Sequence, residues 1–169
     1  HLITTLEELG GVSPVGYAET EHQGSEWLVA HTGQWDLAIV DLFLKQGSGL
    51  GVLEACRARN PEQKVVVLTN YATPDVRVRC HQLGVDAVFD NEEALNLLKA
   101  ALDTGKSRTV SWQKNSRFLD TQDIPKQFEY RGQIVFITNL DPDKIIAKGG
   151  RLAPHMSALI SRSVFLDLC

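Results

Sequence analysis

The sequence has no apolar stretch approaching the roughly 20 residues that a membrane-spanning helix needs. It also lacks a positively charged start followed by an apolar run, the pattern of a secretory signal. Basic residues do not outnumber acidic ones, and the formal net charge is -4. A protein that binds the phosphate backbone of a nucleic acid usually carries a basic patch on its surface. We therefore expect neither a membrane nor a nucleic acid as a partner.

Cysteine is scarce, and its placement argues against a disulfide framework. The three cysteines, Cys56, Cys80 and Cys169, are odd in number and widely spaced. Such usage is typical of a reducing compartment, so we expect a cytoplasmic protein. The five histidines are scattered too, without the short regular spacing of a zinc site.

What the sequence does contain is the composition of a globular protein. Its 169 residues are 43% hydrophobic and 22% charged, which suits one large domain or two small ones. The chain begins at His1 within a helical pattern and stops at Cys169 directly after an apolar run. This pattern predicts a fragment.

Short apolar runs alternate with helical patterns over the first hundred residues. Strands are predicted at residues 15–18, 37–40, 65–68 and 87–89, and helices at 2–9, 27–33, 50–56, 74–83 and 92–102. This alternation is typical of an α/β fold with a doubly wound parallel sheet. The handedness of such crossovers places helices on both faces of the sheet.

Two consecutive predicted strands end in a polar residue, Asp41 and Thr69. Chemistry in open α/β sheets collects beyond the carboxyl ends of the strands. A carboxylate there can attack a phosphoryl group when a cation neutralises the oxygens. A neighbouring hydroxyl can then bind the new phosphate. The alternative is that Asp41 caps a loop and Thr69 only ends a strand.

Three motifs resemble the receiver domain of two-component response regulators over residues 1–102. They are WDLAIVDL at residues 35–42, VVVLTN at 65–70 and GVDAVFD at 84–90. The resemblance implies a flavodoxin-like topology, Asp41 as phospho-acceptor and Thr69 as switch hydroxyl. It also implies a protein partner, either a histidine kinase or an output domain.

The chain departs from the receiver pattern at its metal and phosphate ligands. Receivers begin with a strand that ends in an acidic pair holding Mg²⁺, and this chain starts after that strand. The lysine that pairs with the phosphate falls at Asn91. Mg²⁺ demands several oxygen ligands in octahedral geometry, which Asp41 alone does not supply, and Asp141 is the candidate for a second ligand. We therefore expect a degenerate phospho-acceptor site.

Residues 86–168 show a second resemblance, to the C-terminal half of a phage- or plasmid-type AAA ATPase. It rests on NEEALNLLKAALD at residues 91–103, RTVSW at 108–112, PKQFEY at 125–130, IVFITN at 134–139 and SRS at 161–163. It implies that Asn139 orients a water and that Arg162 acts as an arginine finger. The sequence has no complete Gly-x-x-x-x-Gly-Lys-Ser/Thr pattern, which a phosphate-binding loop requires, so we expect no ATP hydrolysis by this chain alone.

These patterns divide the chain into a receiver-like part, residues 1–102, and an ATPase-like part, residues 103–169. Residues 105–132 are polar and irregular in pattern, and residues 133–139 form a strong strand signal. A receiver without its first strand has an open slot beside the strand at 37–41. We expect residues 133–139 to fill this slot and complete the sheet.

Three alternatives remain open at this stage. The C-terminal part is a mobile tail on a partial receiver, or the chain is a fragment of an AAA ATPase. Alternatively, the chain is a chimera without selected activity, because the receiver pattern and the ATPase pattern both fit residues 86–102.

Overall fold

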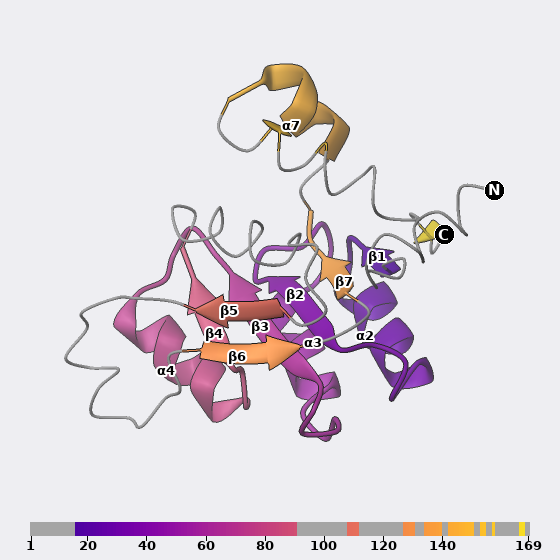
Figure 1. The fold of residues 1–169 in the computed structure, drawn as a ribbon, viewed down its shortest axis with the longest axis vertical. Coiled ribbons are helices and arrows are strands. Elements are labelled where there is room, and N and C mark those ends of the chain that lie inside the picture. The colour runs from indigo at the N-terminus through magenta and orange to yellow at the C-terminus, as the bar shows by residue number, and fades with distance from the viewer. Residues whose placement is uncertain are drawn as a thin grey trace.

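The computed structural model describes residues 16–90, 108–111, 127–130, 134–139, 142–150, 153–154, 157 and 166–167. Their strands and helices build an α/β fold around a parallel sheet (Figure 1). The helices predicted at residues 2–9 and 92–102 lie outside the described residues. The doubly wound, flavodoxin-like fold class is confirmed by the order and direction of the strands.

The sheet has six strands in the order β4-β3-β2-β7-β1-β8, and all neighbours are parallel. The strands are β1 (Gly16–Ala18), β2 (Leu37–Asp41), β3 (Lys64–Leu68), β4 (Ala87–Phe89), β7 (Ile134–Ile137) and β8 (Leu166–Asp167). The first four fall where the sequence predicted them. Strand β8 lies within the apolar run near the end of the given sequence.

Strand β7 lies at the centre of the sheet, between β1 and β2. It pairs with β2 from Leu37–Ile134 to Val40–Ile137, and with β1 through Phe136 and Ile137. The predicted pairing of residues 133–139 with the strand at 37–41 is therefore confirmed. The division into two domains at residue 102 stays a prediction.

Three helices pack against one face of the sheet (Figure 1). They are α2 (Glu21–Ala30), α3 (Gly49–Ala55) and α4 (Pro74–Gln82). Each begins at a hydroxyl residue whose side chain accepts a backbone N–H of the first turn: Thr20, Ser48 and Thr73. Such N-caps typically stabilise a helix by about 1 kcal/mol.

Side chains on both faces of the sheet are buried. The helix-covered face contributes Ala38, Val40, Val65, Val67, Val135 and Ile137 to one core cluster. The alternate residues, which point to the opposite face, are just as inaccessible: Leu37, Ile39, Val66, Ile134 and Phe136. Burial on both faces explains why these strands read as continuous apolar runs rather than as alternating patterns.

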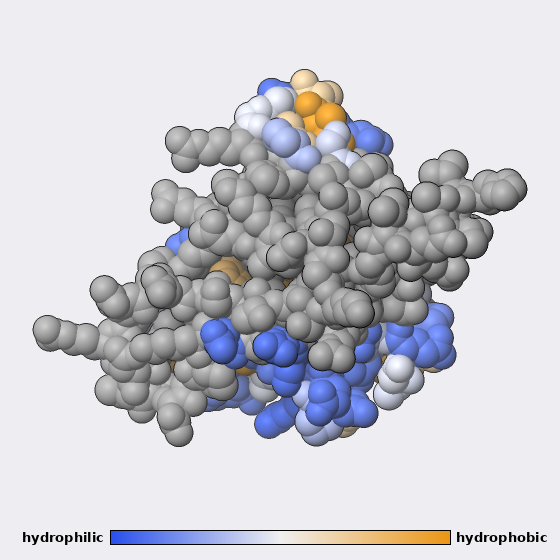
Figure 2. All heavy atoms as spheres, in the orientation of Figure 1, coloured by the Kyte–Doolittle hydropathy of each residue, from blue (hydrophilic) through white to orange (hydrophobic). Residues whose placement is uncertain are grey.

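The sequence predicted irregular structure for residues 105–132, and this prediction is wrong in part. Strands β5 (Arg108–Ser111) and β6 (Gln127–Tyr130) form a separate two-stranded antiparallel sheet. Four-residue strands with charged and polar members leave too short an apolar pattern to be recognised. Helix α7 (Pro142–Lys148) follows strand β7 in the sequence, and Gly149 comes directly after this helix with a φ of 69°. Figure 2 shows apolar atoms gathered over α7, whereas hydrophilic atoms dominate the described lower part of this face.

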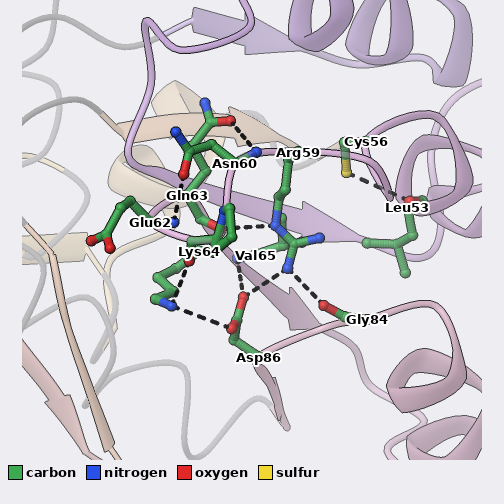
Figure 3. Close-up of polar contacts among 11 residues, drawn as sticks. Leu53, Cys56, Arg59, Asn60, Glu62, Gln63, Lys64, Val65, Gly84 and Asp86 are labelled. Carbon is green, nitrogen blue, oxygen red and sulfur yellow. Dashed lines mark hydrogen bonds and ion pairs between the residues drawn. The ribbon is translucent and has the colours of Figure 1, made fainter.

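A polar cluster fastens the amino ends of β3 and β4 (Figure 3). Arg59 donates to the backbone oxygens of Gln63 (2.8 Å) and Gly84 (2.6 Å), and to the Asp86 carboxylate (2.9 Å). Asp86 also accepts the backbone N–H of Val65 at 2.7 Å. The cluster thus joins the turns before both strands at the end of the sheet opposite Asp41.

Candidate functional site

Asp41 is the last residue of β2 and Thr69 directly follows β3. Because Asp41 pairs with Leu68 in the parallel register, the two polar residues lie at the same edge of the sheet. Asp41 is partly buried, and only 2% of Thr69 is exposed. The structure therefore brings both predicted residues together at the carboxyl ends of the strands.

The Asp41 carboxylate is already hydrogen-bonded within the protein. Its Oδ1 accepts the backbone N–H of Phe43 at 2.9 Å, and the side chain of Thr138 also bonds to it. Burial raises the pKa of Asp41, while the bonds from Phe43, Thr138 and Leu42 act in the opposite direction. Desolvation is the largest of these effects, since removing water disfavours the charged form.

Thr69 forms hydrogen bonds through both its backbone N–H and its side-chain hydroxyl. Its backbone N–H donates to Phe89 O at 3.1 Å, and its Oγ1 accepts the backbone N–H of Tyr71 at 3.2 Å. The rings of Phe43 and Tyr71 contact edge to face, with centroids 5.5 Å apart. The loops after Asp41 and Thr69 are therefore joined to each other through two half-exposed aromatic side chains.

Thr138 is the site residue that the sequence reasoning missed. It follows β7, and the Val40–Ile137 pairing puts it level with Asp41. In the parallel pairing of β7 with β2, residue 138 lies level with Asp41. Counting residues along this pairing would have identified the Thr138 hydroxyl as a neighbour of Asp41. Asn139 is the next residue and is half-buried, at the same edge of the sheet. Asp141 and Arg162 lie outside the described residues.

The described residues at this edge of the sheet do not by themselves fit a Mg²⁺ site. Among the described residues, no group of three or more Asp, Glu, His or Cys side chains is placed to hold a metal ion. Asp41 has a neutral hydroxyl, Thr138, where a second carboxylate would be required. Mg²⁺ takes oxygen ligands in near-octahedral geometry, so Asp41 alone would leave most of the positions around the ion to water.

The glycine-rich loop at residues 47–51 has a different role from phosphate binding. The Glu21 carboxylate accepts the backbone N–H of Ser48 at 2.7 Å. A Cβ on Gly51 would collide with Glu21 Oε1, and a Cβ on Gly49 would collide with Asp41 O. Glycine at these positions therefore lets the chain's own carboxylate and the end of β2 approach the start of α3. This contact ties the loop that follows Asp41 to the first turn of α2.

Replacing Gly51 by alanine should destabilise the protein only while Glu21 is present. The new methyl group displaces the Glu21 carboxylate from Ser48, and hydrogen bonds to charged groups contribute about 1.5–3 kcal/mol. Alanine itself favours a helix over glycine by about 1 kcal/mol. We expect Gly51→Ala to lower the unfolding free energy by about 1 kcal/mol in the natural chain.

The control is the same substitution in a Glu21→Ala background, where the clash is gone. There, Gly51→Ala should raise stability, so the sign of its effect should reverse. Urea unfolding of the four chains in the cycle measures this coupling. Equal effects of Gly51→Ala in both backgrounds would contradict the role assigned to Glu21.

Comparison with known families gives one match over most of the chain. The family model of the response regulator receiver domain matches residues 1–103. An uncharacterized 36.7 kDa protein of Enterobacteria phage T4, from the nrdC–mobD intergenic region, is 42% identical over 121 residues. That alignment covers 72% of this chain and 33% of the phage protein. It is longer than the receiver match, so it extends beyond residue 103.

Named regulators are also similar. The photosynthetic apparatus regulatory protein RegA of Rhodobacter capsulatus is 37% identical over 71 residues, covering 41% of this chain and 39% of RegA. The chain spans about a third of the length of these curated relatives. A solved structure of promoter-bound RcsB from Salmonella enterica covers 47% of this chain and 60% of that chain, at 12% identity and a TM-score of 0.34.

None of the described helices has the length and apolar character required to cross a membrane.

Proposed function

We propose, from the premise that this chain belongs to the response regulator receiver domain family, that it signals through protein contacts without phosphoryl transfer at Asp41. The observation that carries this proposal is the contact of Asp41 with Thr138. The inserted strand β7 supplies a hydroxyl, and not a carboxylate, beside the phospho-acceptor position. The sequence predicted a degenerate phospho-acceptor site, and Thr138 is the side chain to which we attribute part of that loss.

A second feature supports a site that does not hold a phosphoryl group. Position 91, where the receiver pattern has a lysine, is an asparagine. Charge-assisted hydrogen bonds to phosphoryl oxygens are roughly twice as strong as neutral ones, so the loss of the lysine weakens binding. This replacement favours the unmodified carboxylate.

The partner of this module is a protein, with a histidine kinase or an output domain as the two classes that the family suggests. The surface that we assign to it is formed by the last described α/β elements, α4 and β4. Arg77 holds these elements together, since its guanidinium donates to Val88 O at 2.6 Å and to Ala72 O at 3.1 Å. Exposed Phe43 and Tyr71 lie at the loops beside this surface and connect it to Asp41.

Incubation with acetyl phosphate and Mg²⁺ should leave the protein unmodified. Among the described residues, the neutral hydroxyl of Thr138 lies beside Asp41, and the sequence has Asn91 where the receiver pattern has a lysine, so the charge that an acyl phosphate would add at Asp41 is poorly compensated. Intact-mass spectrometry measures the outcome, and Asp41→Asn is the matched control. A stoichiometric phosphate adduct that is absent from Asp41→Asn would contradict the proposal.

The Thr138→Asp variant gives the same experiment a positive arm. Two adjoining carboxylates repel each other without a cation, so this variant should be less stable than the natural chain in EDTA. Added Mg²⁺ should then raise its melting temperature by several degrees and leave that of the natural chain unchanged. A Mg²⁺-dependent increase in the natural chain would show that it already holds the metal.

A further inference from the structure

Strand β7 occupies a slot between β1 and β2, and both of its faces are buried. Its backbone pairs with β1 on one edge and with β2 on the other. Its side chains Ile134, Val135, Phe136 and Ile137 are at most 7% exposed, and they alternate between the two buried faces. This strand is therefore bound in the way that a tightly fitting extended peptide would be bound.

The slot is matched to particular side chains of β7. Helix α2 passes over the strand at Gly24, where a Cβ would lie only 2.9 Å from Ile137 Cγ2. Real Cβ atoms do not approach that closely, so a larger residue at 24 would exclude isoleucine. At the open end of the slot, Thr138 bonds to Asp41. A strand with the sequence of β7 satisfies both requirements.

The strand reaches this slot from a distant part of the sequence. Its neighbours β1 and β2 are complete at Asp41, whereas β7 begins at Ile134. Between β4 and β7, the described strands β5 and β6 pair with each other and not with the six-stranded sheet. Even with β5 and β6 paired to each other, the residues before and after this pair have a maximum length on the order of 70 Å, which is enough to reach a neighbouring molecule.

We propose that the slot between β1 and β2 is an interaction surface for a second copy of this chain. Each copy inserts its own β7 into the slot of the other, so that two complete sheets form a strand-exchanged dimer. A second copy presents the only strand guaranteed to carry the isoleucine and threonine that the slot accommodates. Since the contacts are identical within and between chains, the balance between them depends on protein concentration.

The test uses two full-length variants that are defective in complementary ways. Gly24→Val fills the slot above Ile137, and Ile137→Ala removes the side chain that would collide with it. Each variant alone combines a slot and a strand that do not fit. In an exchanged heterodimer, the natural slot receives the natural strand, and the filled slot receives the smaller strand.

An equimolar mixture, unfolded in urea and refolded together, should therefore give a heterodimer. Ile→Ala substitutions in cores cost several kcal/mol, so we expect the heterodimer dissociation constant to be at least about 100-fold below that of the natural homodimer. Native mass spectrometry distinguishes the heterodimer from homodimers by mass, and light scattering after gel filtration gives its proportion. A refolded mixture that contains only monomers would overturn the proposal.

Two controls keep the result interpretable if either variant folds poorly alone. The double variant Gly24→Val/Ile137→Ala restores the fit within one chain and should refold as a monomer at low concentration. The natural chain should give a dimer when refolded at high concentration and a monomer when refolded dilute. A natural chain that is monomeric after refolding at every concentration would also contradict strand exchange.

Discussion

A chain that ends at Tyr130 should lose its cooperative thermal transition. The truncation removes β7 from between β1 and β2, and β1 has no other described partner than β8, which is removed with it. The exposed edges of β1 and β2 leave backbone groups unpaired within the core, at about 1–3 kcal/mol for each such group. A domain of this size has a total stability of about 5–15 kcal/mol, so several such losses exceed it.

Near-ultraviolet circular dichroism during heating measures this loss. The matched control ends at Gly150, which removes β8 but retains β7 and α7. We expect the control to melt cooperatively within a few degrees of the full chain. A chain ending at Tyr130 that melts as sharply as the control would show that β7 is an appendage to the sheet.

Replacing Arg59 by methionine should lower the unfolding free energy by about 2–3 kcal/mol. Only 11% of the Arg59 side chain is exposed, and its guanidinium bonds to Gln63 O, Gly84 O and Asp86. Methionine retains most of the apolar stem but removes the Arg59 donor from all three acceptors, of which Asp86 keeps the bond from Val65 N–H. Hydrogen bonds to charged groups contribute about 1.5–3 kcal/mol, and the backbone oxygen of buried Gln63 loses its charged donor.

Arg57→Met is the matched control, two residues earlier in the chain. Arg57 forms an exposed ion pair with Glu54 at 3.7 Å, and such pairs contribute about 0–1 kcal/mol. We expect its unfolding free energy to stay within about 0.5 kcal/mol of the natural value. Chemical denaturation of both variants measures the difference, and equal effects would refute the role of the Arg59–Asp86 cluster.

The described β/α order of residues 16–89 was predictable because each element carries its own local signal. Apolar runs such as that of β3 mark doubly buried strands, and Thr73 followed by Pro74 marks the start of α4. Local signals of this kind do not depend on which elements later become neighbours. The strands β5 and β6 were missed for the same reason, since their stability comes from pairing and their own patterns are weak.

The candidate site was predictable in part. Asp41 and Thr69 could be placed at one edge because parallel neighbouring strands end at the same edge of a sheet. Thr138 could not be assigned, since its contact with Asp41 depends on a register between segments about a hundred residues apart. The glycine-rich loop likewise had no identifiable ligand until Glu21 was seen to occupy it.

By itself, the sequence determined that this chain forms a parallel α/β sheet and that Asp41 ends one of its strands. Both follow from short-range patterns of apolar, polar and glycine residues. Only the tertiary structure decided which strand completes the centre of the sheet and which side chain meets Asp41. Those outcomes depend on long-range pairing, whose free energy lies in the contacts of β7 with β1, β2 and α2 and not in any local stretch of sequence.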